Sequence, residues 1–101
     1  MALALRRLLA TFSRPRCLLL YCRPVGDFAV QDGQVAQLRR KLGARFDVET
    51  SSPSKAAQRC RIWVSATQPT FLMLRGEKVV AIAIGCVPLR EIEQLIAHSL
   101  G

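Results

Sequence analysis

The segment TFLML-RGEK-VVAIAI, residues 70–84, holds two apolar runs separated by four residues. Runs of five or six residues that are rich in β-branched and large apolar side chains predict strands. A connection of four residues that contains glycine predicts a hairpin. We therefore expect Thr70–Leu74 and Val79–Ile84 to pair antiparallel. Gly85 then ends the second strand, and Pro88 opens a helix. Its apolar stripe is formed by Leu89, Ile92, Leu95, Ile96 and Leu100.

The N-terminal half of the body alternates strands and helices. Cys17–Cys22 (CLLLYC) is a continuous apolar run, as expected for a parallel strand that is buried on both faces. Apolar residues at helical spacing up to Leu42, followed by Gly43, predict a helix of about ten residues. The segment Arg45–Glu49 alternates like a short strand. Ser52 before Pro53 then predicts the cap and first turn of a short helix through Cys60.

These elements follow the order β-α-β-α-β-β-α. A strand-helix-strand unit crosses over right-handed and makes a parallel pair, to which the C-terminal hairpin adds antiparallel strands. The sequence therefore predicts an α/β fold, a four-stranded mixed sheet with helices on both faces. A chain of 101 residues is too short for two independent cores, so we expect one domain over residues 17–101.

Residues 1–16 differ from this body in charge. The chain has fifteen Lys plus Arg against seven Asp plus Glu, and four of the basic residues (Arg6, Arg7, Arg14 and Arg16) lie before residue 17. Met1–Thr11 is amphipathic, rich in arginine and free of acids, which is typical of a mitochondrial targeting segment. We therefore predict import into mitochondria, with the matrix as the expected compartment. The alternative is a retained basic arm that contacts RNA or a protein partner.

Several function classes are excluded or left without support. Arginines interrupt the only long apolar stretch, near the N-terminus, so no transmembrane helix is expected. Four scattered cysteines and one histidine lack the paired short spacings of a zinc site. We therefore predict no metal and no cofactor.

The segment Val64–Val80 (VSATQPTFLMLRGEKVV) resembles the C-terminal half of thioredoxins, which carries Pro-Thr, an apolar strand, a turn with glycine and a second strand. Upstream, Phe46–Glu49 together with Pro53 is similar to the strand, acidic residue and short helix of that family. The resemblance spans residues 17–101. It implies a thioredoxin-like fold, a cis peptide bond before Pro69 and a substrate-contacting rim formed by Asp27, Trp63, Pro69 and Thr70. A trans Pro69 that simply starts the strand is the alternative.

The dithiol of that family is missing. Its chemistry needs two thiols three positions apart at a helix N-terminus, and no CxxC occurs among Cys17, Cys22, Cys60 and Cys86. One alignment places Asp27 at the position of the nucleophile, where it caps a helix but cannot attack a disulfide. A second alignment keeps Cys22 as a monothiol nucleophile, whose pKa the neighbouring Arg23 would lower. The alternative for Cys22 is an ordinary buried thiol.

Surface charge and one tryptophan offer further contacts. We predict a basic surface for RNA or an acidic subunit, formed by Arg23, Arg39, Arg40, Arg59 and Arg61. Trp63 is interpreted either as a lid over the sheet edge or as an anchor for a partner. The leading functional prediction is a redox-inactive thioredoxin-like subunit of a mitochondrial assembly, with protein subunits as partners. The alternative is a monothiol thiol-disulfide oxidoreductase that uses Cys22.

Overall fold

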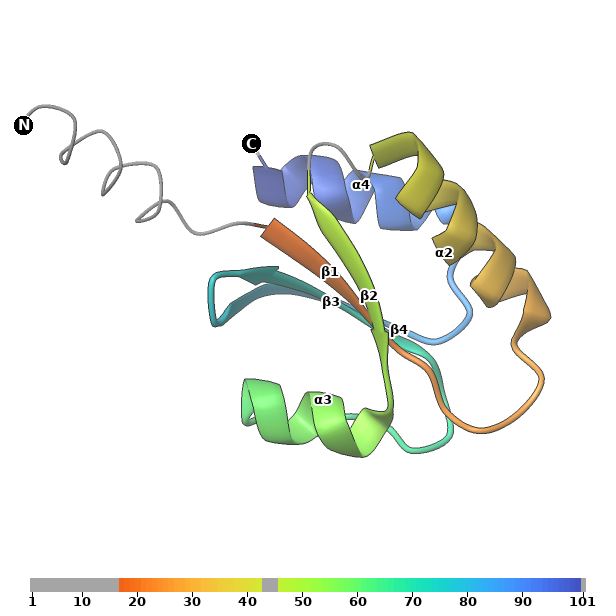
Figure 1. Ribbon diagram of the computed structural model, residues 1–101, viewed down its shortest axis with the longest axis vertical. Helices are drawn as coiled ribbons and strands as arrows, with labels where there is room; N and C mark the ends of the chain where they lie inside the picture. The colour runs from red at the N-terminus through yellow and green to blue at the C-terminus, as the bar shows by residue number, and fades with distance from the viewer. Residues whose placement is uncertain (1–16, 43–45, 101) are drawn as a thin grey trace, which may run out of the picture.

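A computed structural model describes residues 17–42 and 46–100 of the chain, and the predicted leader, residues 1–16, lies outside them. Seven elements follow in the predicted order (Figure 1). They are β1 (Cys17–Cys22), α2 (Ala29–Leu42), β2 (Asp47–Ser51), α3 (Pro53–Cys60), β3 (Thr70–Arg75), β4 (Lys78–Ile84) and α4 (Leu89–Leu100).

The four strands form one mixed sheet in the order β2-β1-β3-β4. β1 pairs parallel with β2 and antiparallel with β3, and β3 pairs antiparallel with β4. A register shift between Met73 and Leu74 leaves one additional residue, Val80, in β4. The predicted α/β class, the mixed sheet and the hairpin are confirmed, and α2 and α4 lie on one face of the sheet while α3 lies on the other (Figure 1).

Side chains alternate between the two faces of each strand, so the central strands supply two apolar layers. The layer under α2 and α4 contains Leu19, Tyr21, Val35, Leu38, Phe46, Phe71, Met73, Ile92 and Ile96. The layer under α3 contains Leu18, Leu20, Cys22, Ala56, Val64, Leu72 and Leu74. Because both faces are covered, β1 is buried almost throughout, as its unbroken apolar run predicts.

The bounds of α2 and β2 differ most from the prediction, while β3 and β4 each gain one residue at the hairpin, Arg75 and Lys78. α2 begins at Ala29, about two turns before the apolar spacing starts, because the Asp27 carboxylate accepts a hydrogen bond of 3.3 Å from the Ala29 N–H. The second strand is Asp47–Ser51, which ends two residues later than the predicted Arg45–Glu49, and Arg45 lies outside the described residues. Its register with β1 places Val48 beside Leu19, so the half-buried Val48 faces α2.

The short helix α3 forms as predicted. Ser52 stands before it in an extended conformation, and its hydroxyl accepts a hydrogen bond of 3.3 Å from the Lys55 N–H. Pro53 occupies the first turn, where no N–H is needed. The helix ends at Cys60, and the residue after it, Arg61, adopts a left-handed conformation with φ 55° and ψ 42° and donates its N–H to the Ala57 carbonyl.

Replacing Arg61 by glycine is expected to raise the free energy of unfolding by about 1 kcal/mol, because a Cβ is unfavourable in the left-handed region. Denaturant unfolding of both proteins measures the difference. Arg61→Ala is the control, since alanine keeps the Cβ and should bring no such gain. A glycine variant that is no more stable than the alanine variant would contradict this explanation.

Candidate functional site

The predicted nucleophile Cys22 is the last residue of β1, and it is completely buried. Its side chain points into the layer beneath α3, and its Sγ lies 3.9 Å from the Leu20 carbonyl oxygen. Burial raises the pKa of Cys22 from 9.0 to about 12, with a smaller contribution from Cys60. A thiol in this position is almost entirely protonated at neutral pH, so it is a poor nucleophile.

The expectation that Arg23 lowers the pKa of Cys22 is wrong. The Arg23 N–H extends the ladder by bonding to the Ser51 carbonyl at 2.9 Å, so its side chain leaves the strand on the side opposite to Cys22. There the guanidinium pairs with the Asp32 carboxylate, with Nε to Oδ1 at 2.8 Å and Nη2 to Oδ2 at 3.1 Å. Neighbours in sequence thus face different sides of the sheet.

Arg23 instead organises the connection between β1 and α2. Its guanidinium donates to the carbonyls of Pro24 at 3.0 Å and Gly26 at 3.2 Å, and its carbon lies 5.8 Å from the centre of the Phe28 ring. The Tyr21 hydroxyl donates to Asp32 Oδ1 at 3.1 Å. This group of contacts borders a shallow cavity of about 290 Å³, lined by Tyr21, Arg23, Asp32, Val35, Ala36, Arg39 and Thr50.

The ion pair of Asp32 makes the stability of the folded protein depend on pH. The hydrogen bonds from Arg23 lower the pKa of Asp32, and the hydrogen bond from Tyr21 adds to this effect. A carboxyl with a lowered folded-state pKa contributes stability above its unfolded pKa of about 3.9, and that contribution is lost as pH falls through the folded value. We expect Asp32→Asn to be less stable than the native chain at pH 6, with the difference shrinking toward pH 2. Unfolding curves across this range measure it, and a difference that is constant with pH would contradict the assignment.

The four residues of the predicted rim differ in exposure and do not form one surface. Asp27 is exposed in front of α2, and Trp63, in the loop after α3, is 80% exposed. Pro69 and Thr70 are buried and cannot form part of an exposed rim. Asp27 lies in the β1–α2 connection and Trp63 in the α3–β3 connection, and α2 and α3 cover opposite faces of the sheet (Figure 1).

The predicted cis bond before Pro69 is also wrong, since the described residues contain no cis peptide. The Ser65 hydroxyl accepts hydrogen bonds from the N–H groups of Thr67 at 3.3 Å and Gln68 at 3.1 Å, which fixes a turn before the proline. The Pro69 carbonyl then accepts a hydrogen bond of 2.8 Å from the Gly85 N–H. The peptide bond before Pro69 is therefore trans. The Pro69 carbonyl extends the pairing between β3 and β4 beyond Thr70.

The five arginines of the predicted basic surface do not share one face. Arg39 and Arg40 lie on α2, whereas Arg59 and Arg61 lie at the end of α3 on the opposite side of the sheet. Arg23 is paired with Asp32, and Arg59 Nη1 lies 2.9 Å from Glu49 Oε2. The structure therefore divides this charge and neutralises part of it, which weakens the case for one nucleic-acid surface.

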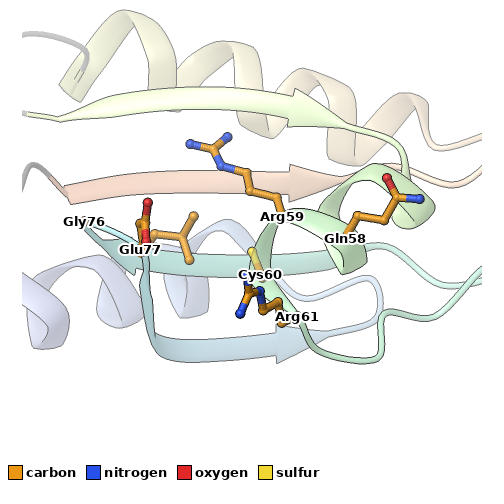
Figure 2. A pocket seen from close by; sticks show the side chains of 7 residues that line it. Gln58, Arg59, Cys60, Arg61, Gly76 and Glu77 are labelled. Atoms are coloured by element: carbon orange, nitrogen blue, oxygen red, sulfur yellow. The ribbon is translucent and has the colours of Figure 1, made fainter.

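A second cavity, of about 460 Å³, lies between the end of α3 and the β3–β4 turn (Figure 2). It is lined by Gln58, Arg59, Cys60, Arg61, Leu74, Gly76 and Glu77. Burial raises the pKa of the Cys60 thiol, while nearby Arg59 acts in the opposite direction. This cavity was not predictable from the sequence, because twelve residues separate its two walls along the chain and neither wall carries a recognisable motif.

The cysteines do not form the constellation of a dithiol enzyme. All four are free, with Cys22 buried, Cys17 and Cys60 partly exposed and Cys86 exposed. Within residues 17–42 and 46–100, no three His, Cys, Asp or Glu side chains gather as a metal site would require. In the same part of the chain, no helix is long and apolar enough to cross a bilayer.

Comparison with known proteins adds no assignment. The sequence matches no protein-family model, and it has no significant match among curated proteins.

Proposed function

We propose that this protein is a redox-inactive, thioredoxin-like binding module that serves as a subunit of a larger assembly in the mitochondrial matrix. The observation that carries the proposal is the position of Cys22. The thiol that the resemblance offers as a nucleophile is buried in the core beneath α3, and its pKa is raised to about 12. Thiol-disulfide exchange needs an accessible thiolate, so a binding role fits this chain better than catalysis does.

The architecture supports the finer fold assignment. The order β-α-β-α-β-β-α, the mixed sheet and the helices on both faces agree with what the thioredoxin resemblance implies. The loop between β1 and α2, where that family holds its dithiol, contains Arg23 tied to Asp32 and no thiol. A scaffold of this kind can keep its packing while its reactive groups are lost, because fold and function are separable.

Exposed apolar side chains support a contact role. Trp63 is 80% exposed, and Val25 in the β1–α2 loop is fully exposed. Tryptophan is enriched among residues that dominate binding energy at protein interfaces. Mitochondrial import rests on the composition of residues 1–16, which carry four arginines and no acid.

Fractionation of cells that express the tagged full chain tests this proposal. We expect the protein in mitochondria, within a particle larger than a dimer of the 11.2 kDa chain. Trp63→Ala should leave the fold intact and release the protein from the particle. Val30→Ala, which truncates another exposed apolar residue, is the matched control and should stay bound. Recovery of the native chain only as free protein, or outside mitochondria, would contradict the proposal.

A further inference from the structure

The two edges of the sheet differ sharply in how they are protected. The outer strand β2 (DVETS) is polar, with Asp47, Glu49 and Thr50 exposed. The Ser51 carbonyl faces β1, where it accepts the Arg23 N–H, so by alternation the Val48 carbonyl faces outward. Arg39 donates to that carbonyl at 3.3 Å through both Nε and Nη2. Charge and a side-chain hydrogen bond thus block further pairing at β2.

The other edge, β4, carries no such charge or side-chain hydrogen bond between Ala81 and Ile84, and the register shift at Val80 is its one irregularity. Within the described residues, no strand pairs with its outer side. The hydrogen bond from the Gly85 N–H to the Pro69 carbonyl sets the alternation, so Ala81 and Ala83 bond to β3. The backbone N–H and C=O groups of Ile82 and Ile84 therefore point toward the open edge.

The side chains of β4 add an exposed apolar stripe. Ile82 and Ile84 lie opposite Leu72 and Thr70, on the face that carries α3, and they are 48% and 53% exposed. Val80, two positions before Ile82, is 45% exposed. No charged residue interrupts the strand from Val79 to Ile84. An apolar edge strand with free backbone groups is a template for pairing with another strand.

We propose that a second copy of this chain occupies the edge, with the two β4 strands antiparallel about a two-fold axis at Ile82. The strand is its own complement in this register. Ile82 faces its counterpart and exchanges both backbone hydrogen bonds with it, and Val80 faces Ile84 of the partner. Ala81 faces Ala83, so small residues meet on the other side of the sheet. No charged residue lies between Val80 and Ile84, so no like charges oppose each other in this register.

The size and charge of this contact set its strength. A strand pair of this length buries much less surface than the roughly 800 Å² per partner of a standard interface. We therefore expect a weak dimer, with a dissociation constant on the order of 100 μM. The chain carries a net charge of +8, so two copies repel each other. Added salt screens that repulsion and should therefore strengthen the dimer.

Sedimentation of the full chain over a range of concentrations tests the register. Val80→Lys and Ile84→Glu should each weaken the dimer by about tenfold or more, because each places an unpaired charge against an apolar partner. The double variant should recover most of this loss, since the introduced lysine and glutamate then face each other across the axis. Within one chain the two positions are about 13 Å apart along the strand, too far for a salt bridge. Val30→Lys is the matched control and should dimerise like the native chain, because Val30 lies on α2 and is also exposed.

A native chain that remains monomeric to millimolar concentration would overturn the proposal. A dimer that survives the single substitutions, or that the double variant does not restore, would also overturn it. If the purified chain is monomeric and chemical cross-linking in cells joins β4 to a strand of a different protein, the second copy is the wrong occupant. Thermal unfolding of each variant separates lost pairing from lost folding.

Discussion

Replacing Phe71 by alanine is expected to lower the free energy of unfolding by about 3–5 kcal/mol, as truncation of a fully buried phenylalanine usually does. Phe71 has no exposed surface and is the second residue of β3, where it pairs with Tyr21 of β1 and Ala83 of β4. Its ring stacks on Tyr21 with a centroid distance of 5.1 Å and an interplanar angle of 11°. Since small domains are stable by only about 5–15 kcal/mol, this loss should leave the protein marginally folded.

Denaturant unfolding followed by circular dichroism measures the effect of Phe71→Ala. Val25→Ala is the control, because Val25 is fully exposed and its truncation should change stability by less than about 0.5 kcal/mol. If Phe71→Ala costs less than about 1 kcal/mol, the ring is not packed in the layer between the sheet and α2.

The second large effect concerns the reactivity of Cys22. Burial raises its pKa from 9.0 to about 12, so at neutral pH it holds on the order of a thousandfold less thiolate than an ordinary thiol. We expect a thiol-specific reagent to label Cys22 about a thousandfold more slowly in the folded protein than in denaturant. Burial also blocks the reagent from reaching the thiol, which slows the labelling of Cys22 further.

This measurement needs a chain in which Cys22 is the only thiol, with Cys17, Cys60 and Cys86 replaced by serine. The same chain in denaturant gives the unprotected rate. A companion chain that keeps only Cys86 is the second control, because that residue is exposed and should react quickly in the folded state. Fast labelling of Cys22 under native conditions would contradict its burial.

The architecture was predictable because its signals are local. The apolar run of β1 gives its bounds directly, and the turn with Gly76 gives the hairpin. Ser52 and Pro53 mark the start of α3. By contrast, the first two turns of α2 carry no apolar periodicity, since Val30 is exposed, and the only signal for their start was the capping residue Asp27.

The candidate site was less predictable because it depends on direction and distance in space. The sequence places Arg23 next to Cys22, but strand alternation turns the two side chains to opposite faces, and Arg23 finds Asp32 nine residues later. The family resemblance suggested an exposed Pro69, yet pairing with Gly85 draws that residue into the interior. Sequence spacing alone does not encode either outcome.

The proposal that this protein does not perform thiol exchange is tested most directly by incubating the folded native chain with glutathione disulfide at neutral pH. Peptide mass spectrometry then reads the modification at each cysteine. We expect Cys22 to remain free of glutathione, and we expect Val25→Cys, which completes a CxxC spacing, to gain no disulfide reductase activity. A reversible glutathione adduct on Cys22 in the folded protein would show an active monothiol and contradict the claim.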